Sequence, residues 1–243
     1  MNNVRRAIVR IVGLAPGTLL VAGLPKAARA ATPGEGRLKI GIIGSGRVGG
    51  TLGGVWANAG HQVMLSSRDI EHDRALAARI GANARAGSPR EAAVFGDILM
   101  IAVPYGALPG IGKDLGDLIK GKVVIDTCNP FAGRDGDVAT WAREKGAGLA
   151  SAELLPGARL VRAFNAIGYA QMGAAHQQPG RIGMPIAGDD REAIVLASRL
   201  VRDIGFEPVP IGGLAMGRHL MPGTPLAGER PAEEIRKIAR SLE

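Results

Sequence analysis

The sequence has little of several residue types on which protein chemistry often depends. Its 243 residues include a single cysteine, Cys128, so no disulfide can form within the chain and no zinc site can be built from cysteine pairs. The four histidines never stand at the spacing of a zinc enzyme, and we expect no metal. Aromatic residues make up 3% of the chain, too few for the stacking platforms that bind single-stranded nucleic acid.

The excess of positive charge is concentrated at the N-terminus. The chain carries 30 Lys and Arg against 22 Asp and Glu, a formal net charge of +8. Residues 1–30 hold five of the basic residues and no acidic one, so the rest of the chain carries only +3. A basic surface on the folded part is therefore not supported, and we expect no nucleic-acid partner.

Residues 1–30 have the order of an export signal. Arg5-Arg6 precede an uncharged run at 11–24, and Ala28-Arg29-Ala30 follows with small residues, where we expect cleavage after Ala30. The run is too short to cross ~30 Å of hydrocarbon as a helix, so we expect no stable membrane span. The paired arginines resemble a twin-arginine signal, which predicts export to the periplasm. The alternative is a disordered basic tail on a cytoplasmic protein.

From Leu38 to Phe164, short apolar runs alternate with helical patterns. The predicted strands cover 38–43, 62–66, 97–103, 122–126 and 160–164, and the predicted helices cover 47–59, 69–80, 108–119 and 137–145, with another that starts at Ser88. Alternation of this kind predicts an α/β fold, a Rossmann-type doubly wound parallel sheet with helices on both faces. The runs lack polar alternation, which favours strands buried on both faces.

The pattern loosens after Asn165. Strands are predicted at 182–188 and 206–211, a helix at 190–204 and a last helix at 231–242. We therefore expect an export signal at 1–30, a dinucleotide-binding domain at 31–165, and a small C-terminal α/β extension at 166–243 for acceptor binding and dimerisation. The segment after Gly212 is too short to form a core alone, so it should pack on the first domain or on a second copy.

The segment between the first strand and the first helix is rich in glycine. It reads G-x-G-x-x-G and comprises Gly44, Ser45, Gly46, Arg47, Val48 and Gly49. In this context the first glycine makes a tight turn, the second lets the backbone approach a pyrophosphate, and the third allows close contact of helix and strand. The helix then presents free N–H groups and its positive dipole end to the anion. A dinucleotide site is predicted, with a glycine-rich turn that binds nothing as the alternative.

The residues at the end of the second strand determine whether such a site prefers NAD or NADP. An acidic residue there would bind the ribose 2′-OH of NAD. The sequence instead has Ser66-Ser67-Arg68. Arg68 can pair with a 2′-phosphate, Ser67 can donate a hydroxyl, and Arg47 could lie near the same ribose. We expect NADP; NAD stays open because of Asp69, which we interpret as a helix cap.

Two more segments follow strands at the same predicted edge, outside which ligands of such folds bind. Val103-Pro104-Tyr105 would give a rigid wall at Pro104 and a flat face at Tyr105 near the nicotinamide, or Pro104 merely ends the strand. Asn129 follows the strand at 122–126. It would bond the nicotinamide amide or ribose, or cap a turn before Pro130.

Together these motifs resemble the NADP-dependent coenzyme F420 reductases. The likeness runs from Leu38 to about Pro222 and is carried by Ile-Gly-Ser-Gly-Arg-Val-Gly at 43–49, Ser-Ser-Arg at 66–68, Val-Pro-Tyr at 103–105, Ala-Phe-Asn at 163–165 and Ile-Ala-Gly-Asp-Asp at 186–190. Members that reduce F420 are cytoplasmic, whereas this chain begins with an export-like segment.

The resemblance implies a role for each matching segment. Residues 45–48 would contact the pyrophosphate and adenosine, Ser67 and Arg68 the 2′-phosphate, and Val103 and Pro104 the nicotinamide. Asn165 to Ile167 would lie beside a flavin-like ring. The resemblance also favours a homodimer. A similar domain serves ferric and flavin reductases, so a flavin or another acceptor stays open.

No catalytic side chain stands out, since the sequence has no nucleophile elbow and no motif of paired carboxylates. Hydride transfer between a nicotinamide and a flavin-type ring needs the two rings to be held close together and water to be excluded, rather than acid–base groups. We therefore predict an NADP(H)-dependent oxidoreductase with a small-molecule hydride acceptor, F420 or a flavin. The alternatives are an NADP-binding sensor or carrier without turnover, and a dehydrogenase for a small keto or imine substrate.

Overall fold

The computed structural model describes residues 36–175 and 182–242, so the predicted export signal lies outside the described residues. An eight-stranded sheet forms the centre of the described part, in the order β3-β2-β1-β4-β5-β6-β7-β8. Its strands are β1 (Lys39–Ile43), β2 (Gln62–Ser66), β3 (Ala84–Ala86), β4 (Ile98–Ile101), β5 (Val123–Asp126), β6 (Arg159–Arg162), β7 (Gly183–Gly188) and β8 (Glu207–Gly212). All neighbours pair in parallel except β6 and β7, which are antiparallel. The predicted α/β Rossmann-type sheet is confirmed.

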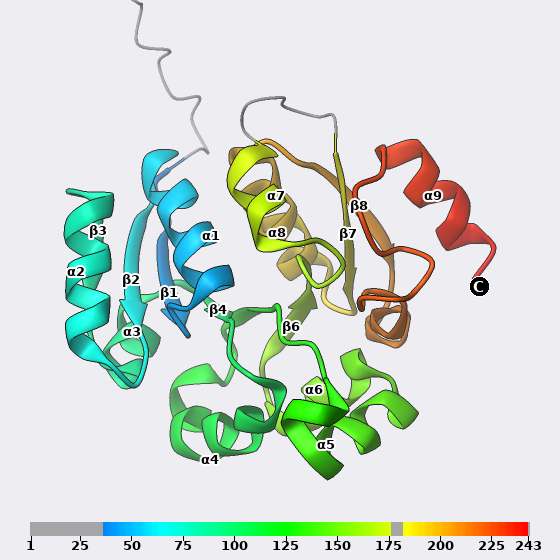
Figure 1. The fold of residues 1–243 in the computed structure, drawn as a ribbon, viewed down its shortest axis with the longest axis horizontal. Coiled ribbons are helices and arrows are strands. Elements are labelled where there is room, and N and C mark those ends of the chain that lie inside the picture. The colour runs from blue at the N-terminus through cyan, green and yellow to red at the C-terminus, as the bar shows by residue number, and fades with distance from the viewer. Residues whose placement is uncertain (1–35, 176–181, 243) are drawn as a thin grey trace, which may run out of the picture. The chain divides into compact units, whose positions relative to one another are not determined.

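Helices cover both faces of this sheet (Figure 1). They are α1 (Arg47–Asn58), α2 (Ile70–Ile80), α3 (Pro89–Phe95), α4 (Leu108–Ile119), α5 (Ala132–Lys145), α6 (Ala147–Leu154), α7 (Tyr169–Ala174), α8 (Arg191–Asp203) and α9 (Ala232–Arg240), with 3-10 turns η1 (Tyr105–Ala107) and η3 (Leu214–His219). None of the described helices is long and apolar enough to cross a membrane.

Alternate residues of the buried strands pack into two separate hydrophobic cores, one on each face of the sheet. Ile42 belongs to the core that contains residues of α1, α2, α7 and α8, while its neighbour Ile43 belongs to the core that contains residues of α3, α4, α5 and α6. Successive side chains of a strand point to opposite faces, so apolar residues at every position are what a sheet covered on both sides requires.

The starts of α2, α3 and α8 carry side-chain caps. Asp69 accepts a hydrogen bond from the backbone N–H of His72 and so caps α2, as interpreted above. Ser88 and Glu91 form a reciprocal capping box at α3, and Asp190 caps α8. Each cap satisfies N–H groups that a helix leaves without partners in its first turn.

The C-terminal strands continue the sheet of the N-terminal half, because β7 pairs with β6. An aromatic group joins the two parts: the Phe164 ring meets Trp56 and Phe206 edge-on, at 5.9 and 6.0 Å between centroids. The Trp56 indole also donates to the Leu200 carbonyl of α8 at 2.9 Å. Phe164 has a φ of 67°, a left-handed backbone that is uncommon for a bulky residue. Packing around its ring holds it there.

Candidate functional site

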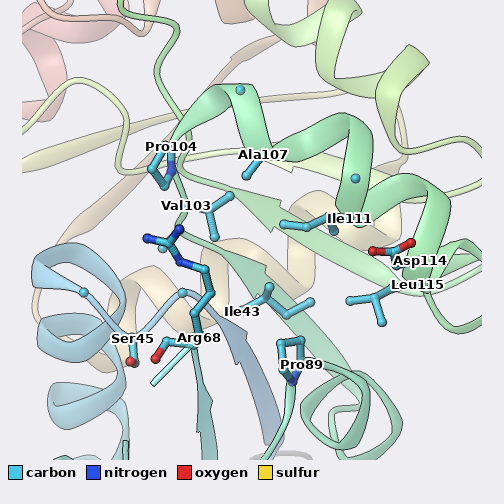
Figure 2. Close-up of a pocket in the computed structure, with 16 residues that line it drawn as sticks. Ile43, Ser45, Arg68, Pro89, Val103, Pro104, Ala107, Ile111, Asp114 and Leu115 are labelled. Atoms are coloured by element: carbon cyan, nitrogen blue, oxygen red, sulfur yellow. The ribbon is translucent and has the colours of Figure 1, made fainter. Parts of the chain in front are cut away.

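A pocket of about 780 Å³ lies at the carboxyl ends of β1, β2 and β4. Figure 2 shows Arg68 extending into it from the end of β2, with Val103 and Pro104 on the segment that follows β4. Its lining comprises Ile43, Gly44, Ser45, Gly46, Ser67, Arg68, Pro89, Ala102, Val103, Pro104, Gly106, Ala107, Gly110, Ile111, Asp114 and Leu115. Seven of the site residues predicted from sequence are among them, drawn from the glycine turn, the β2 end and the β4 end.

The three motif glycines have different surroundings. Gly44 has a φ of +102°, and a Cβ on Gly49 would lie 1.9 Å from the Gly44 carbonyl oxygen, so the protein itself requires glycine at both positions. At Gly46, a Cβ would meet no atom within 4 Å. Protein packing gives no reason for glycine there, whereas a ligand approaching the backbone would.

The N-terminus of α1 is open. Its N-cap, Gly46, offers no side chain to the first turn, and that turn holds no acidic residue. Asp69, Ser88 and Asp190 fill this role at α2, α3 and α8. The first-turn N–H groups of α1 therefore have no side-chain acceptor among the described residues, and an anion can use them.

Ser66 supports the turn from below. Its hydroxyl donates to the Ile42 carbonyl at 2.7 Å, and its carbonyl accepts from the N–H groups of Gly44 and Ser45 at 2.8 and 3.1 Å. The residue is fully buried and does not line the pocket. Ser66, predicted from the sequence to contact the nucleotide, instead lies outside the pocket lining and holds the turn between β1 and α1 in place.

A buried carboxylate that sequence reasoning missed joins the two loops. Asp73, in the first turn of α2, is fully buried and accepts hydrogen bonds from the hydroxyls of Ser45 and Ser67, the latter at 3.0 Å. An acid in a first turn usually indicates only a partner for the helix dipole, so the sequence carried no signal of this role. A serine hydroxyl has one proton to donate, and Ser67 directs its proton to Asp73.

Arg68 is the free cation of the pocket. Its guanidinium makes neither an ion pair nor a hydrogen bond within residues 36–175 and 182–242, and its side chain is exposed. Figure 2 shows it pointing into the pocket. A charge that the fold leaves without a partner can pair with a phosphate at full strength.

Tyr105 lies elsewhere than predicted. The turn η1 directs its ring into the core, where it is fully buried and its hydroxyl lies 3.0 Å from the Ser151 hydroxyl of α6. Burial raises the pKa of Tyr105 to about 12, so the phenol stays neutral. The expectation of a flat face beside a nicotinamide is wrong, because a ring enclosed by protein cannot stack on a ligand.

Asn129 and Asn165 also lie away from the pocket lining. The Asn129 side-chain amide donates to the Asn165 carbonyl at 2.7 Å and so ties together the loops that follow β5 and β6. Asn165 is buried, and its Oδ1 has no hydrogen-bond partner in the described structure. Ile167 packs against the core on the α1 face. Their predicted contacts with the nicotinamide and the acceptor stay predictions, and the structure gives Asn129 a bonding role within the fold.

Beneath these two asparagines lies a buried ion pair. Asp126 and Arg162, opposite each other on β5 and β6, are both fully buried and bonded to each other. The Arg162 guanidinium also donates to the Cys128 carbonyl at 3.0 Å and to Ser151 at 3.3 Å. Burial raises the pKa of the Cys128 thiol, which keeps it protonated and unreactive. In the described ranges no cluster of His, Cys, Asp or Glu could hold a metal.

Comparison with known proteins agrees with this fold. Residues 39–130 match the family described as NADP oxidoreductase, coenzyme F420-dependent. The F420-dependent NADP reductase of Methanothermobacter thermautotrophicus is 28% identical over 205 residues, which cover 78% of this chain and 87% of that one. Metalloreductase STEAP3 of Rattus norvegicus is 28% identical over 185 residues, 75% of this chain but only 35% of the relative. A hypothetical protein from Sinorhizobium meliloti superposes with a TM-score of 0.66 at 25% identity, covering 81% of this chain and 96% of that structure.

The family match supports the resemblance noted in the sequence. It spans β1 to the loop after β5 and therefore includes the glycine turn, Arg68, and the Val103-Pro104 wall. The pocket lies wholly inside the matched segment.

Proposed function

We propose that this chain is an NADP(H)-dependent oxidoreductase that transfers a hydride between the nicotinamide and a flavin-like acceptor, F420 or a flavin. The observation that carries the proposal is the meeting, in one pocket, of an open helix N-terminus and an arginine that has no partner in the described part of the chain. Two fixed sources of positive potential in one cavity fit a ligand with two separate phosphate groups. The family match at 39–130 and the named relatives support the same class of activity.

The residues present fit the nucleotide. The first-turn N–H groups of α1 would hold the pyrophosphate, and the bare Gly46 leaves the space it needs. Arg68 would bind the 2′-phosphate. Asp69 is committed to capping α2, so it does not serve as the acid that a ribose 2′-OH of NAD would require. NADP is therefore favoured over NAD.

Val103, Pro104 and Ile111 provide an apolar wall for the nicotinamide, which supplies the hydride chemistry when NADP(H) is bound. These side chains would orient the ring and exclude water from one of its faces. Among the pocket residues in the described structure, Arg68 and Asp114 are the ionisable ones. A keto or imine substrate needs a nearby proton donor, and the one carboxyl group of this described lining, Asp114, is exposed to solvent and poorly placed for that role. A ring system that accepts hydride without such help suits the pocket better.

The first experiment measures binding and turnover on the same protein. Calorimetry with NADPH and NADH should show tighter binding of NADPH, and added F420, FMN or FAD should then be reduced as the reduced-nicotinamide absorbance falls. Binding without reduction of any acceptor would instead support the sensor or carrier alternative. If neither nucleotide binds, the proposal is wrong.

A further inference from the structure

A second cavity, of about 420 Å³, adjoins the pocket described above. Ser67, Arg68 and Pro89 line both spaces, so the two cavities are neighbours at the end of β2. The remaining lining comes from the start of α2, the end of β3 and the start of α3: Ile70, Arg74, Ala86, Gly87, Ser88 and Glu91. Beyond Ser67 and Arg68, none of these residues was predicted from the sequence to bind a ligand.

Two arginines face this second cavity, and neither is firmly paired. Arg68 has no partner within the described residues. Arg74 pairs with Glu71 at 2.5 Å, but both side chains are more than half exposed, at 64% and 75%. Ion pairs as exposed as this one are weak, since water and salt screen them. Arg74 can therefore exchange Glu71 for a stronger anionic partner at little cost.

The carboxylates near the second cavity are already bound to donors. Glu91 accepts from the Ser88 backbone N–H at 2.7 Å. That bond, together with the one from the Ser88 side chain, lowers the pKa of Glu91, so its charge stays in the cap of α3. Asp73 is buried and accepts from Ser67. Among the described residues, Glu71 is the carboxylate that pairs with a cavity arginine.

A 2′-phosphate bound at Arg68 needs further donors, because it has three acceptor oxygens. The Ser67 hydroxyl, expected from sequence to be one of them, gives its proton to Asp73. The guanidinium of Arg74 offers a second planar fork on the same cavity. Ile70, 36% exposed, adds an apolar surface suited to an adenine ring.

We propose that the second cavity receives the adenosine 2′-phosphate end of the nucleotide, and that Arg74 acts with Arg68 to select a 2′-phosphate over a 2′-hydroxyl. Glu71, as the exposed partner of Arg74, competes weakly with the phosphate for its guanidinium. The inference rests on the proposed function and adds to it a specificity-determining residue on α2 and an acidic residue that opposes it.

The test uses the full chain and two fragments of the nucleotide, 2′,5′-ADP and 5′-AMP, with affinities measured by calorimetry. Arg74→Met should weaken 2′,5′-ADP by about tenfold, the loss of one charge-assisted contact, and leave 5′-AMP unchanged. Arg68→Met should show the same selectivity with a larger loss. Glu71→Gln should tighten 2′,5′-ADP by about twofold, because it removes the competing carboxylate.

Arg79→Met is the matched control. Arg79 is exposed in the last turn of the same helix and makes neither an ion pair nor a hydrogen bond within the described residues, so neither ligand should change. Arg74→Lys keeps the charge without the fork and should retain part of the 2′,5′-ADP affinity. Thermal melting of each variant shows that the fold is intact.

The outcomes separate the two proposals. If Arg74→Met weakens both fragments equally, or neither, while wild-type protein still prefers NADPH to NADH, this inference is overturned and the proposed function stands. Unchanged affinity of Glu71→Gln for 2′,5′-ADP would also contradict the inference. If wild-type protein binds neither dinucleotide, the proposed function fails and the inference fails with it.

Discussion

The carboxyl edge of the sheet has an open part and a closed part. Strands β1, β2 and β4 end at the pocket, where Arg68 has no protein partner within the described structure. Strands β5 and β6 end beneath α6 and η3, where Arg162 is fully buried and bonded to Asp126, to Ser151 and to the Cys128 carbonyl. We call this second set, with Tyr105, the closed cluster. Both parts place polar residues directly after buried strands, and both contain an arginine.

What separates the two parts is the segment that covers them. Gly148 of α6 and Gly217 of η3 pack on the Arg162 side chain: a Cβ on Gly148 would lie 3.4 Å from its Cδ, and one on Gly217 would lie 2.8 Å away. An arginine buried under later segments must have its charge compensated by other protein groups, whereas an exposed arginine can remain without a protein partner and be available to a ligand. The comparison teaches that a polar residue at a strand end stays accessible to a ligand only where no later segment closes over it.

The largest effect should come from breaking the closed cluster. Arg162→Met removes one partner of a buried ion pair and leaves Asp126 buried without its counter-charge, which should cost about 3–5 kcal/mol in free energy of unfolding. Urea denaturation measures the loss. The matched change in the open part, Arg68→Met, should cost less than about 0.5 kcal/mol because its guanidinium has no partner to lose. Equal losses in the two variants would contradict the division into closed and open parts.

The next effect should appear in nucleotide binding at the open part. Arg68→Met should weaken NADPH by about 10- to 100-fold, since a charge-assisted contact with a phosphate is lost, and should leave NADH nearly unchanged. Calorimetry with both nucleotides measures the ratio. A uniform loss for both would place Arg68 on the shared pyrophosphate instead.

Within the glycine turn, Gly46→Ala should show whether glycine at this position serves ligand binding or protein stability. A Cβ at Gly46 meets no protein atom and the backbone φ of −66° suits alanine, so the melting temperature should hold. NADPH should bind about tenfold more weakly, because the methyl group occupies space at the pyrophosphate. Gly49→Ala is the contrast: its Cβ would overlap the Gly44 carbonyl, and thermal melting should detect the destabilisation. Unchanged NADPH affinity in Gly46→Ala would argue against a pyrophosphate there.

The smallest effect concerns the pH dependence of the closed cluster. Burial raises the pKa of Tyr105 to about 12 from an ordinary value of 10.0. The stability linked to this raised pKa is fully present below pH 10 and is lost as pH rises toward 12. Tyr105→Phe should therefore flatten the alkaline loss of stability and cost about 1 kcal/mol at neutral pH through the lost bond to Ser151. Denaturation across this pH range measures both, with the exposed Tyr169→Phe as control; identical profiles for the two variants would count against the assignment.

Local signals in the sequence predict much of this fold. Strand β2 and helix α4 have the bounds expected from the sequence, and the caps at Asp69, Ser88 and Asp190 are confirmed. Periodicity and capping are properties of neighbouring residues, so a single sequence contains them. The glycine turn is also correct in position, because its strand–turn–helix context is local.

The sequence does not reveal the elements that lack a local pattern. Strand β3 has three residues without an apolar run, and helix α6 is rich in alanine and glycine, with no apolar stripe on one side. The burial of Tyr105 and of Asp73 was not predicted for another reason: it depends on segments far along the chain or on a second loop. The export signal and the homodimer stay predictions.

The edge-on contacts among Trp56, Phe164 and Phe206 affect how chimeras of this chain and its relatives can be built. A crossover placed at Asn165, at the expected domain boundary, would separate Phe206 from the Phe164 ring that it meets edge-on. It would also separate Trp56 from the Leu200 carbonyl to which its indole donates. It would also divide β6 from β7, which share backbone hydrogen bonds. Chimeras that exchange the C-terminal segment should therefore fold only when the buried side of α1 comes from the same parent protein.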